Sequence, residues 1–279
     1  MRRGATMRSG LLPIQLFRLL CGLLEERTGV DYNASVMETF SAKVYARLAV
    51  VGFDTPLDYY YFLRYDAAAT DEFDALVDDL VVNESYFFRE ADQLKSLRDD
   101  VILPLVERGE RPRIWCAAAS TGEEPLSIAM LLADAGVLSQ VDIVASDISR
   151  KALARAQSGE YNIFSLRACP LDMQQRYIDV TAGRIVVAPE IRAKVEWHRL
   201  NLLDASAIAA LGTFDGILCR NVLIYFNDAT IRRVVGTLSG ALRTGGRLFV
   251  GATESLFRFG ILLRAEEKNG AFSYLRAHE

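Results

Sequence analysis

Apolar residues recur at every third or fourth position in the first part of the chain. Leu16, Leu20, Leu23 and Leu24 have this spacing, and two later groups share it: Phe40, Val44 and Leu48, then Phe73, Leu76, Val77 and Leu80. Such spacing collects apolar side chains on one face of a helix, whereas the strict alternation typical of a half-buried strand is absent. The pattern therefore predicts helices only over residues 11 to about 80.

The pattern changes after Arg111, where short apolar runs alternate with helical stretches. The runs occupy residues 114–116, 141–145, 214–219 and 247–250. Runs that are apolar on both faces are typical of parallel strands covered by helices on each side, and their alternation with helices is typical of βαβ units. We therefore predict an α/β domain with a doubly wound parallel sheet after the helical domain.

This alternation is interrupted over residues 161–197, where 185–187 and 195–197 are short strand candidates. We interpret the region as a small inserted β-subdomain. Near the end of the chain, the Lys-Asn-Gly sequence at 268–270 is a hairpin turn signal. We expect it to add an antiparallel edge to the sheet.

Composition and charge exclude several function classes. With 51% hydrophobic residues and a net charge of −4, the chain matches an ordinary globular protein and offers no basic surface for nucleic acid. It has only 2 histidines and 4 cysteines, and the cysteines lie far apart without CxxC spacing. These are too few ligands for a His or Cys metal site. We expect no metal, reduced cysteines and a cytoplasmic location.

The start of the chain imitates a signal peptide. Arg2, Arg3 and Arg8 precede a leucine-rich stretch over residues 11–24. Polar residues interrupt that stretch, charged residues at 25–27 follow where a cleavage site should lie, and the stretch is too short to cross a bilayer. We expect an amphipathic, core-facing helix behind a frayed tail, with no membrane insertion.

Candidate chemistry lies in the loops after the predicted strands, because ligands of doubly wound sheets bind at the carboxyl ends of the strands. The loop at 117–125 (AAASTGEEP) consists of small residues followed by Glu123 and Glu124, and it lacks the GxGxxG of dinucleotide sites. Two carboxylates at this position suit a cationic ligand better than a pyrophosphate. They also fit an ordinary helix start with acids near the positive end of the helix dipole, and this loop alone does not separate the two.

Two further loops carry polar groups. Asp147 ends the second strand, 25 residues beyond Gly122, about the offset at which an acid accepts hydrogen bonds from ribose hydroxyls. The same residue could instead be the N-cap of the next helix, and both roles can coexist. The third loop, residues 220–226 (RNVLIYF), begins polar and ends aromatic. It lacks the proline that nucleic-acid amino-methyltransferases have here.

These segments together resemble one known family. They are 83–90 (NESYFFRE), 115–130 (WCAAASTGEEPLSIAM), 145–149 (ASDIS), 201–203 (NLL), 214–226 (FDGILCRNVLIYF) and 245–251 (GGRLFVG). In order and spacing, and in the helical segment before them, they resemble the CheR-type chemotaxis receptor methyltransferases. The resemblance extends over nearly the whole chain, and a set of loop motifs is more specific than a fold.

The resemblance implies a Rossmann-like class I methyltransferase. It would have a helical domain at 11–82, a linker that contacts the cofactor at 83–110, and an S-adenosylmethionine-dependent domain at 111–279 with the inserted β-subdomain at about 161–197. The family transfers a methyl group from S-adenosylmethionine to glutamate side chains of chemotaxis receptors, which forms glutamyl methyl esters and S-adenosylhomocysteine. The expected partner is therefore the cytoplasmic methylation helices of a methyl-accepting receptor.

By the same resemblance, nine residues match cofactor-contacting positions: Asn83, Ser85, Arg89, Glu124, Asp147, Asn201, Leu202, Arg220 and Asn221. Arg89 and Tyr225 match positions beside the methyl group, and we assign them to orient the incoming carboxylate. A simpler explanation for Arg89 is an interdomain ion pair with Glu90 or a similar acid, and for Tyr225 a place in the core. A glutamate carboxylate is already ionised at neutral pH, so the reaction needs neither a general base nor a metal.

The helical domain departs from the family pattern. Its basic helix normally faces the acidic receptor, but here residues 11–80 contain 5 basic and 12 acidic residues. Lys43 and Arg47 match basic family positions on one helix face, and we assign them to the substrate. Residues 179–184, which link two expected strands of the subdomain, are fewer than in members that first bind a receptor C-terminal pentapeptide. We therefore predict tether-independent recognition.

Two alternatives remain open at this stage. One is a methyltransferase of the same fold that acts on another acidic protein or on a small carboxylate. The other is a cofactor-binding regulator without catalytic activity, which the presence of Arg89, Asp147, Asn221 and Tyr225 disfavours.

Overall fold

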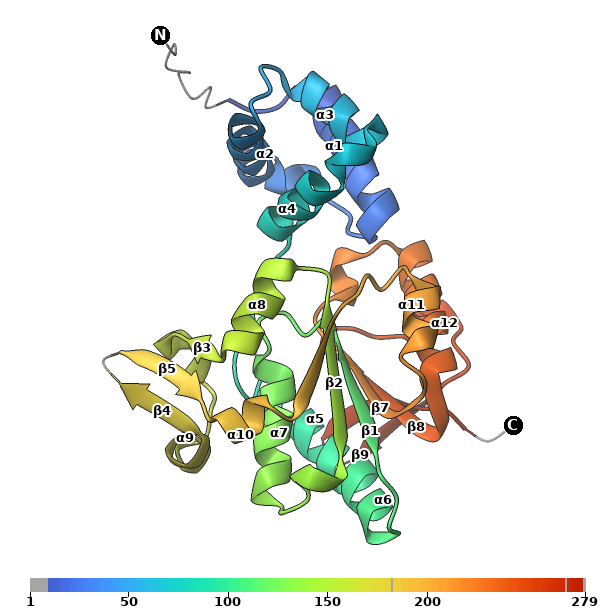
Figure 1. Cartoon of the computed structure of the whole chain (residues 1–279). Helices are drawn as coiled ribbons and strands as arrows, with labels where there is room; N and C mark the ends of the chain where they lie inside the picture. The colour runs from blue at the N-terminus through green and yellow to red at the C-terminus, as the bar shows by residue number, and fades with distance from the viewer. Residues whose placement is uncertain (1–9, 182, 269, 278–279) are drawn as a thin grey trace. The chain divides into compact units, whose positions relative to one another are not determined.

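The computed structural model describes residues 10–181, 183–268 and 270–277. The chain divides into two compact units, residues 1–82 and 83–279, which are described separately (Figure 1). The arginines of the expected N-terminal tail, Asn269 of the expected hairpin turn and His278 lie outside the described residues.

The described part of the first unit is helical, as predicted. Its elements are α1 (Ile14–Thr28), η1 (Ala34–Val36), α2 (Met37–Val51), α3 (Pro56–Tyr65), η2 (Ala67–Ala69) and α4 (Thr70–Leu80). Leu20, Val44 and Leu76 are completely buried, so the apolar faces recognised in the sequence meet in one core. Thr55 begins α3 by accepting a bond from Asp58 N at 3.1 Å, and Pro56 fits the first turn because it needs no amide partner there.

The second unit contains a seven-stranded sheet in the order β6-β2-β1-β7-β8-β10-β9. The strands are β1 (Arg113–Ala117), β2 (Asp142–Asp147), β6 (Val195–Arg199), β7 (Phe214–Cys219), β8 (Leu242–Val250), β9 (Arg264–Lys268) and β10 (Ala271–Leu275). β6, β2, β1, β7 and β8 pair in parallel, whereas β10 pairs antiparallel with both β8 and β9. The doubly wound sheet and its antiparallel edge hairpin are confirmed.

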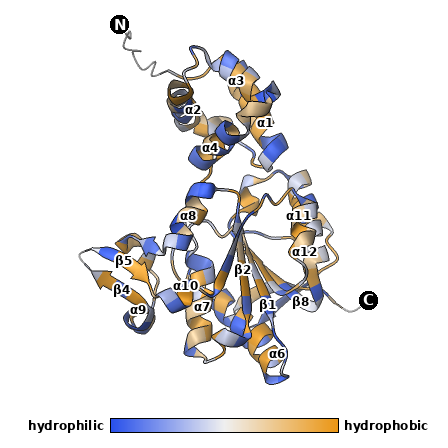
Figure 2. Cartoon of the chain, viewed as in Figure 1, coloured by the Kyte–Doolittle hydropathy of each residue, from blue (hydrophilic) through white to orange (hydrophobic). Residues whose placement is uncertain are grey.

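Helices cover both faces of this sheet. They include α5 (Ala91–Ser96), η3 (Leu97–Ile102), α6 (Leu103–Glu107), α7 (Glu123–Asp134), η4 (Leu138–Gln140), α8 (Arg150–Ser158), α11 (Ala205–Ala210), η6 (Leu223–Tyr225), α12 (Asp228–Ala241) and η7 (Phe257–Phe259). Ile114 of β1 packs into a core with α5, η3 and α7, and its neighbour Trp115 packs into a second core with α12. Figure 1 shows α7 and α12 on opposite sides of the sheet, and Figure 2 shows hydrophobic residues along β1 and β8 between them.

The inserted subdomain is smaller than predicted. Its three-stranded sheet has the order β3-β5-β4, and its elements are β3 (Glu160–Tyr161), η5 (Ile163–Leu166), α9 (Leu171–Tyr177), β4 (Ile178–Thr181), β5 (Arg184–Val187) and α10 (Pro189–Arg192). The candidate strand at 195–197 instead belongs to β6, which pairs in parallel with β2 at the edge of the main sheet. The prediction placed it wrongly because β6 is only half-buried, so it lacks the two-sided apolar pattern of the inner strands.

Residues 83–110 belong to the second unit and are more than a linker. α5, η3 and α6 follow one another without a break, and η3 is a π-helical segment. Leu94, Leu97 and Ile102 are buried in the core beneath the sheet. Their helical spacing was the signal for this helix. The helix fixes the segment before it, which is predicted to contact the cofactor, to the sheet.

Candidate functional site

Several of the predicted cofactor-contacting residues lie at the carboxyl ends of the parallel strands. β1 is the point of reversal in the strand order, since the chain continues to β2 and β6 on one side and to β7 and β8 on the other. A crevice for a ligand forms at such a switch point. Glu124 follows β1, Asp147 ends β2, Asn201 follows β6 and Arg220 follows β7.

The loop between β1 and α7 is tightly packed. Gly122 has a φ of 90°, and a Cβ on it would come within 2.6 Å of Ala156 Cβ and 2.8 Å of Trp197 Cη2. Ala118 and Ser120 also have positive φ values, 59° and 51°, which cost energy in residues other than glycine. Strained backbone of this kind clusters at binding sites, where the surrounding structure maintains it.

Asp147 connects two of the loops. Its Oδ2 accepts a bond from Ser120 N at 2.7 Å and its Oδ1 accepts one from Ser149 N at 2.9 Å, and the residue is buried. The N-cap of α8 is Ser149, whose Oγ accepts from Ala152 N at 3.1 Å, so an N-cap role for Asp147 is wrong. Ser120 Oγ also lies 3.5 Å from Asn83 Oδ1, which places the predicted Asn83 at the same loop.

A buried arginine organises the centre of the site. The Arg220 side chain is 2% exposed, and its Nη1 and Nη2 lie 2.6 Å from Glu124 Oε2 and 3.1 Å from Glu90 Oε2. Nη2 also donates to the main-chain O of Arg89 at 2.7 Å. Burial lowers the pKa of the Arg220 guanidinium, but the charges of Glu124 and Glu90 outweigh burial and raise it. One cation and two carboxylates leave the cluster with a net negative charge.

Glu90 was not predicted as a site residue. Besides Arg220, it accepts bonds from Asn221 Nδ2 at 3.3 Å and from Ala252 N at 3.1 Å. Burial raises the pKa of the Glu90 carboxyl, but Arg220 and these two donors outweigh burial and lower it. The alternative explanation of Arg89 by an ion pair with Glu90 is wrong, because Glu90 is directed to Arg220 instead.

Glu254 is a second residue that the sequence did not assign. Its buried carboxylate accepts main-chain bonds from Gly251 N at 2.7 Å, Asn221 N at 2.7 Å and Ile224 N at 3.2 Å. It therefore joins the loops after β7 and β8. We call Glu254 and these three main-chain bonds the Glu254 clamp. Asn221 itself has a φ of 57°, so the clamp maintains a strained backbone. An acid in a loop directly after a buried strand was the available signal.

Arg89 and Tyr225, the predicted catalytic residues, lie within electrostatic reach of each other. Arg89 Nη1 donates to the main-chain O of Glu84 at 3.2 Å, and its guanidinium lies 5.6 Å from the centre of the Tyr86 ring. Burial raises the pKa of Tyr225, the positive charge of Arg89 opposes this rise, and the charges of Glu84 and Glu254 add to it. Tyr225 is only half-buried and is not a core residue.

The remaining predicted cofactor contacts differ in which of their groups are available to a cofactor. Asn201 Oδ1 accepts from Leu203 N at 3.0 Å, which fixes the orientation of its amide. The Leu202 side chain is buried in the core with α12, so a cofactor could meet only its main chain. Ser85 is half-buried in the segment before α5.

The two predicted substrate residues belong to the first unit. Lys43 is exposed on α2. Arg47 is mostly buried and forms an ion pair with Glu72 of α4, with Asp79 at 3.9 Å. Tyr59 OH donates to the same Glu72 at 2.6 Å. Glu72 therefore links α2, α3 and α4 through Arg47 and Tyr59, and a receptor contact by Arg47 stays a prediction.

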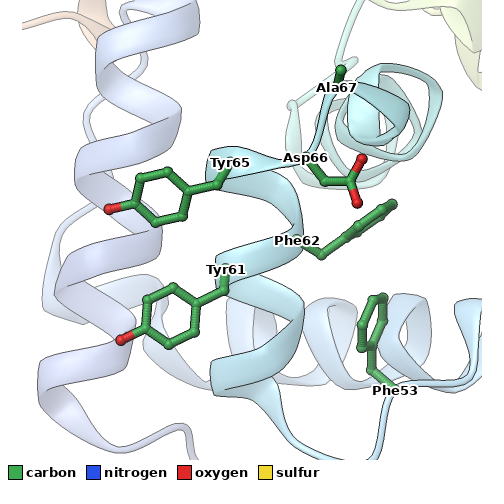
Figure 3. Close-up of a pocket in the computed structure, with 6 residues that line it drawn as sticks. All are labelled: Phe53, Tyr61, Phe62, Tyr65, Asp66 and Ala67. Atoms are coloured by element: carbon green, nitrogen blue, oxygen red, sulfur yellow. The ribbon is translucent and has the colours of Figure 1, made fainter.

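The first unit also carries a hollow of about 520 Å³, lined by Phe53, Tyr61, Phe62, Tyr65, Asp66 and Ala67 (Figure 3). The Tyr61 and Tyr65 rings stack with their centres 6.1 Å apart, and Phe53 and Phe62 form a second pair at 5.1 Å. The hollow is open, and none of the residues predicted for the cofactor or the reaction lines it.

Three findings limit the chemistry of the described residues. Groups of three or more His, Cys, Asp or Glu side chains arranged for a metal are not found among them. Every helix that the structure describes is too short or too polar to span a bilayer. The four cysteines are all buried, free thiols.

Comparisons with known proteins identify the family. The model "CheR methyltransferase, SAM binding domain" matches residues 83–269, and "CheR methyltransferase, all-alpha domain" matches residues 15–81. The chain belongs to the CheR methyltransferase family. It is thus an S-adenosylmethionine-dependent methyltransferase with the α/β fold and helical domain that the sequence predicted.

Relatives of this CheR-family protein share most of its length. Chemotaxis protein methyltransferase 2 of Vibrio cholerae is 33% identical over 260 residues, which cover 91% of this chain and 90% of that protein. Chemotaxis protein methyltransferase 1 of Pseudomonas aeruginosa is 40% identical over 191 residues, 65% of this chain and 69% of that protein. The chemotaxis protein methyltransferase of Salmonella typhimurium is 32% identical over 264 residues, 92% of this chain and 88% of that protein.

The residues of the site fit S-adenosylmethionine. Arg220 Nε is a buried donor that has no partner among the described residues, and a buried donor of this kind requires an acceptor. The carboxylate of the methionine moiety is such an acceptor. The net negative cluster of Glu90, Glu124 and Arg220 complements the ammonium and sulfonium groups of the same molecule.

Proposed function

We propose that this CheR-family protein transfers the methyl group of S-adenosylmethionine to glutamate side chains of chemotaxis receptors, which forms glutamyl methyl esters and S-adenosylhomocysteine. The observation that carries the proposal is the cluster around Arg220, because it holds two acids and an unpaired donor at the switch point of the sheet. The names of the relatives, whose similarity extends through both units, support a chemotaxis receptor as the substrate.

Each loop would hold one part of the cofactor. Asp147, fixed by Ser120 N and Ser149 N, faces the ribose hydroxyls, for which a carboxylate is a suitable acceptor. Asn201 and the main chain of Leu202 suit the edge of the adenine. The cluster of Arg220, Glu90 and Glu124 would bind the methionine moiety of the cofactor. Asn83, Ser85, Arg89 and Asn221 complete the predicted contacts.

The protein has little chemistry to perform beyond positioning. S-adenosylmethionine, when bound, supplies an electrophilic methyl group on its sulfonium. A glutamate side chain has a pKa of about 4.3, so it is already a nucleophilic carboxylate at neutral pH and loses no proton during the transfer. The enzyme therefore gains most by holding this carboxylate in line and by excluding water from it.

Arg89 and Tyr225 are the groups we assign to that task. Arg89 would attract the carboxylate by its charge. The raised pKa of Tyr225 keeps its hydroxyl protonated at neutral pH, so it donates one neutral hydrogen bond. A neutral donor holds a carboxylate with less loss of nucleophilicity than an ion pair does. The two residues together orient the nucleophile without neutralising it.

Receptor recognition and cellular location are the finer parts of the proposal. We assign exposed Lys43 of α2 to the acidic receptor surface, and Arg47 to the same surface only as an addition to its pair with Glu72. A substrate on the cytoplasmic part of a receptor implies a cytoplasmic enzyme, consistent with four free cysteines.

One experiment tests the reaction directly. The full-length protein is incubated with methyl-labelled S-adenosylmethionine and membranes that contain a chemotaxis receptor, and label on the receptor is scored for release by base. We expect base-labile label that disappears when glutamines replace the methylated glutamates of the receptor. Base-stable label, or none on the receptor, would contradict the proposal.

A further inference from the structure

An arginine from the inserted subdomain lies beside the predicted catalytic arginine. The Arg167 guanidinium sits 3.7 Å from the centre of the Tyr86 ring, and the Arg89 guanidinium sits 5.6 Å from the same centre. Two guanidinium groups thus lie near the Tyr86 ring, although the two arginines belong to segments far apart in the sequence. Contact with the face of an aromatic ring attracts a guanidinium and helps to keep it in place.

The position of Arg167 is fixed by its own segment. Its Nη1 donates to the main-chain O of Phe164 at 3.0 Å. The subdomain is in turn attached to the segment that carries Arg89, because Phe87 N donates to the main-chain O of Ser165 at 2.9 Å. Arg167 therefore has a defined position on the segment that carries Arg89 and is not a loose surface side chain.

This surface is open to a partner. The Arg167 side chain is 42% exposed, and its ion pair with Glu84 at 3.2 Å involves a carboxylate that is 74% exposed. Ile163 and Phe164, the neighbouring residues of η5, are also exposed. An exposed ion pair is weak, so an incoming carboxylate can replace Glu84. Arg89 adds a charge that its bond to a main-chain carbonyl does not neutralise.

We propose that Arg167, held on Tyr86, binds a second carboxylate of the protein substrate while Arg89 and Tyr225 hold the glutamate that is methylated. The inference rests on the proposed function and adds a specificity residue to it. On an acidic helix, carboxylates three or four positions apart lie on one face, so a single substrate helix presents both groups. The planar fork of an arginine matches a carboxylate better than the point charge of a lysine does.

The test is a set of steady-state measurements with receptor-containing membranes as the varied substrate. Arg167→Ala should raise KM for the receptor about fivefold, the effect of one exposed charge pair, with kcat unchanged. Arg167→Lys should recover part of this loss. Glu84→Gln should lower KM, because it removes the competing carboxylate. The difference between wild type and Arg167→Ala should shrink at high salt, since exposed charges are screened.

Arg111→Ala is the matched control. Arg111 is also an exposed arginine, and it pairs with Asp142 at 2.7 Å, at the amino ends of β1 and β2 on the opposite edge of the sheet. It should leave KM unchanged. If Arg167→Ala behaves like this control, or if it weakens S-adenosylhomocysteine binding in calorimetry instead of raising KM, the inference is wrong while the proposed function stands. If the wild-type protein forms no receptor esters, both are wrong.

Discussion

Asp147 is the single residue on which cofactor affinity should depend most. Asp147→Asn removes the charge from the acceptor assigned to the ribose hydroxyls, and hydrogen bonds to charged groups contribute about 1.5–3 kcal/mol each. We expect S-adenosylmethionine to bind at least tenfold more weakly in isothermal titration calorimetry.

Ser149→Ala is the control for this change. It removes the N-cap of α8 and should lower the free energy of unfolding by about 1 kcal/mol, but it leaves the Asp147 carboxylate and its bond from Ser149 N in place. Cofactor affinity should therefore stay at the wild-type value. Equal affinity in Asp147→Asn and wild type would remove Asp147 from the cofactor site.

Tyr225 gives a prediction about pH. Burial raises its pKa, so the hydroxyl stays protonated up to and beyond the ordinary tyrosine value of about 10. We expect kcat of the wild type to show no decrease from tyrosine ionisation between about pH 7 and 9.5. Tyr225→Phe should lower kcat throughout this range without a change in the free energy of unfolding.

The comparison of the two pH profiles decides the assignment. Because burial disfavours the ionised phenol, ionisation of Tyr225 lowers the free energy of unfolding only above about pH 10, outside the range compared. A decrease in kcat below pH 9 that is present in the wild type and absent in Tyr225→Phe would contradict the assignment. So would wild-type turnover by the folded variant.

Three of the predicted site residues share one property: each lies at the carboxyl end of a parallel strand that the sequence revealed. Asp147, Arg220 and Asn221 could be placed together because the carboxyl ends of parallel strands meet at one edge, whereas Asn201 was indicated only by the family resemblance. Glu90 could not be assigned in this way, because its partner Arg220 is far away in the sequence and the contact exists only in the folded chain. Pairings across such distances have no periodic signal.

Among the structural elements, the loops after β7 and β8 should respond most to one substitution. Glu254→Gln replaces a carboxylate that accepts three main-chain bonds with an amide that has only one acceptor oxygen. Buried donors that lose their acceptor cost about 1–3 kcal/mol. We expect a decrease of this size in the free energy of unfolding by urea, together with lower kcat, because Asn221 and Tyr225 lie in the loop that is released.

Glu267→Gln is the matched control, because Glu267 is an exposed glutamate on β9. It should leave both stability and kcat unchanged. A Glu254→Gln variant as stable as this control would show that the clamp contributes little. Loss of stability with normal kcat would show that the clamp does not position the catalytic loop.

Among the strands, burial on both faces decided which ones could be predicted from the sequence. β1 is buried after its first residue and β7 is buried throughout, and both were found directly, whereas the half-buried β6 was assigned to the wrong sheet. The helix at 91–107 was predicted as part of a linker, although its buried leucines have helical spacing; the π-helical segment η3 in its middle departs from the regular period of an α-helix. The hairpin of β9 and β10 was found from its turn alone.

For the whole molecule, the charge of the helical unit matters for how a receptor is recognised. Residues 11–80 contain 12 acidic and 5 basic residues, and Arg47 is already paired with Glu72. Lys43 remains as an exposed cation of α2. The basic surface near the reaction is instead the pair Arg89 and Arg167 of the second unit. This distribution favours recognition of the receptor at Arg89 and Arg167 over recognition by a basic helix.

The last prediction concerns the receptor C-terminus. A tether peptide would bind by adding a strand to an edge of the small sheet, where main-chain bonds give affinity and pockets for alternate side chains give specificity. The edge strand β4 spans only residues 178–181, and β5 begins at residue 184. So short an edge pairs with few peptide residues and leaves little room for pockets. We therefore expect no binding of a receptor C-terminal pentapeptide in calorimetry.

The decisive comparison uses one receptor in two lengths. Removal of the last five receptor residues should leave kcat/KM for methylation unchanged if the receptor is recognised at Arg89 and Arg167 and on α2. Arg167→Ala should lower kcat/KM equally for both lengths, because the residue acts on the methylated segment and not on the tether. A loss of kcat/KM on truncation, with peptide binding mapped to residues 160–187, would instead make the small sheet the primary docking site, and the prediction of tether-independent recognition would be wrong.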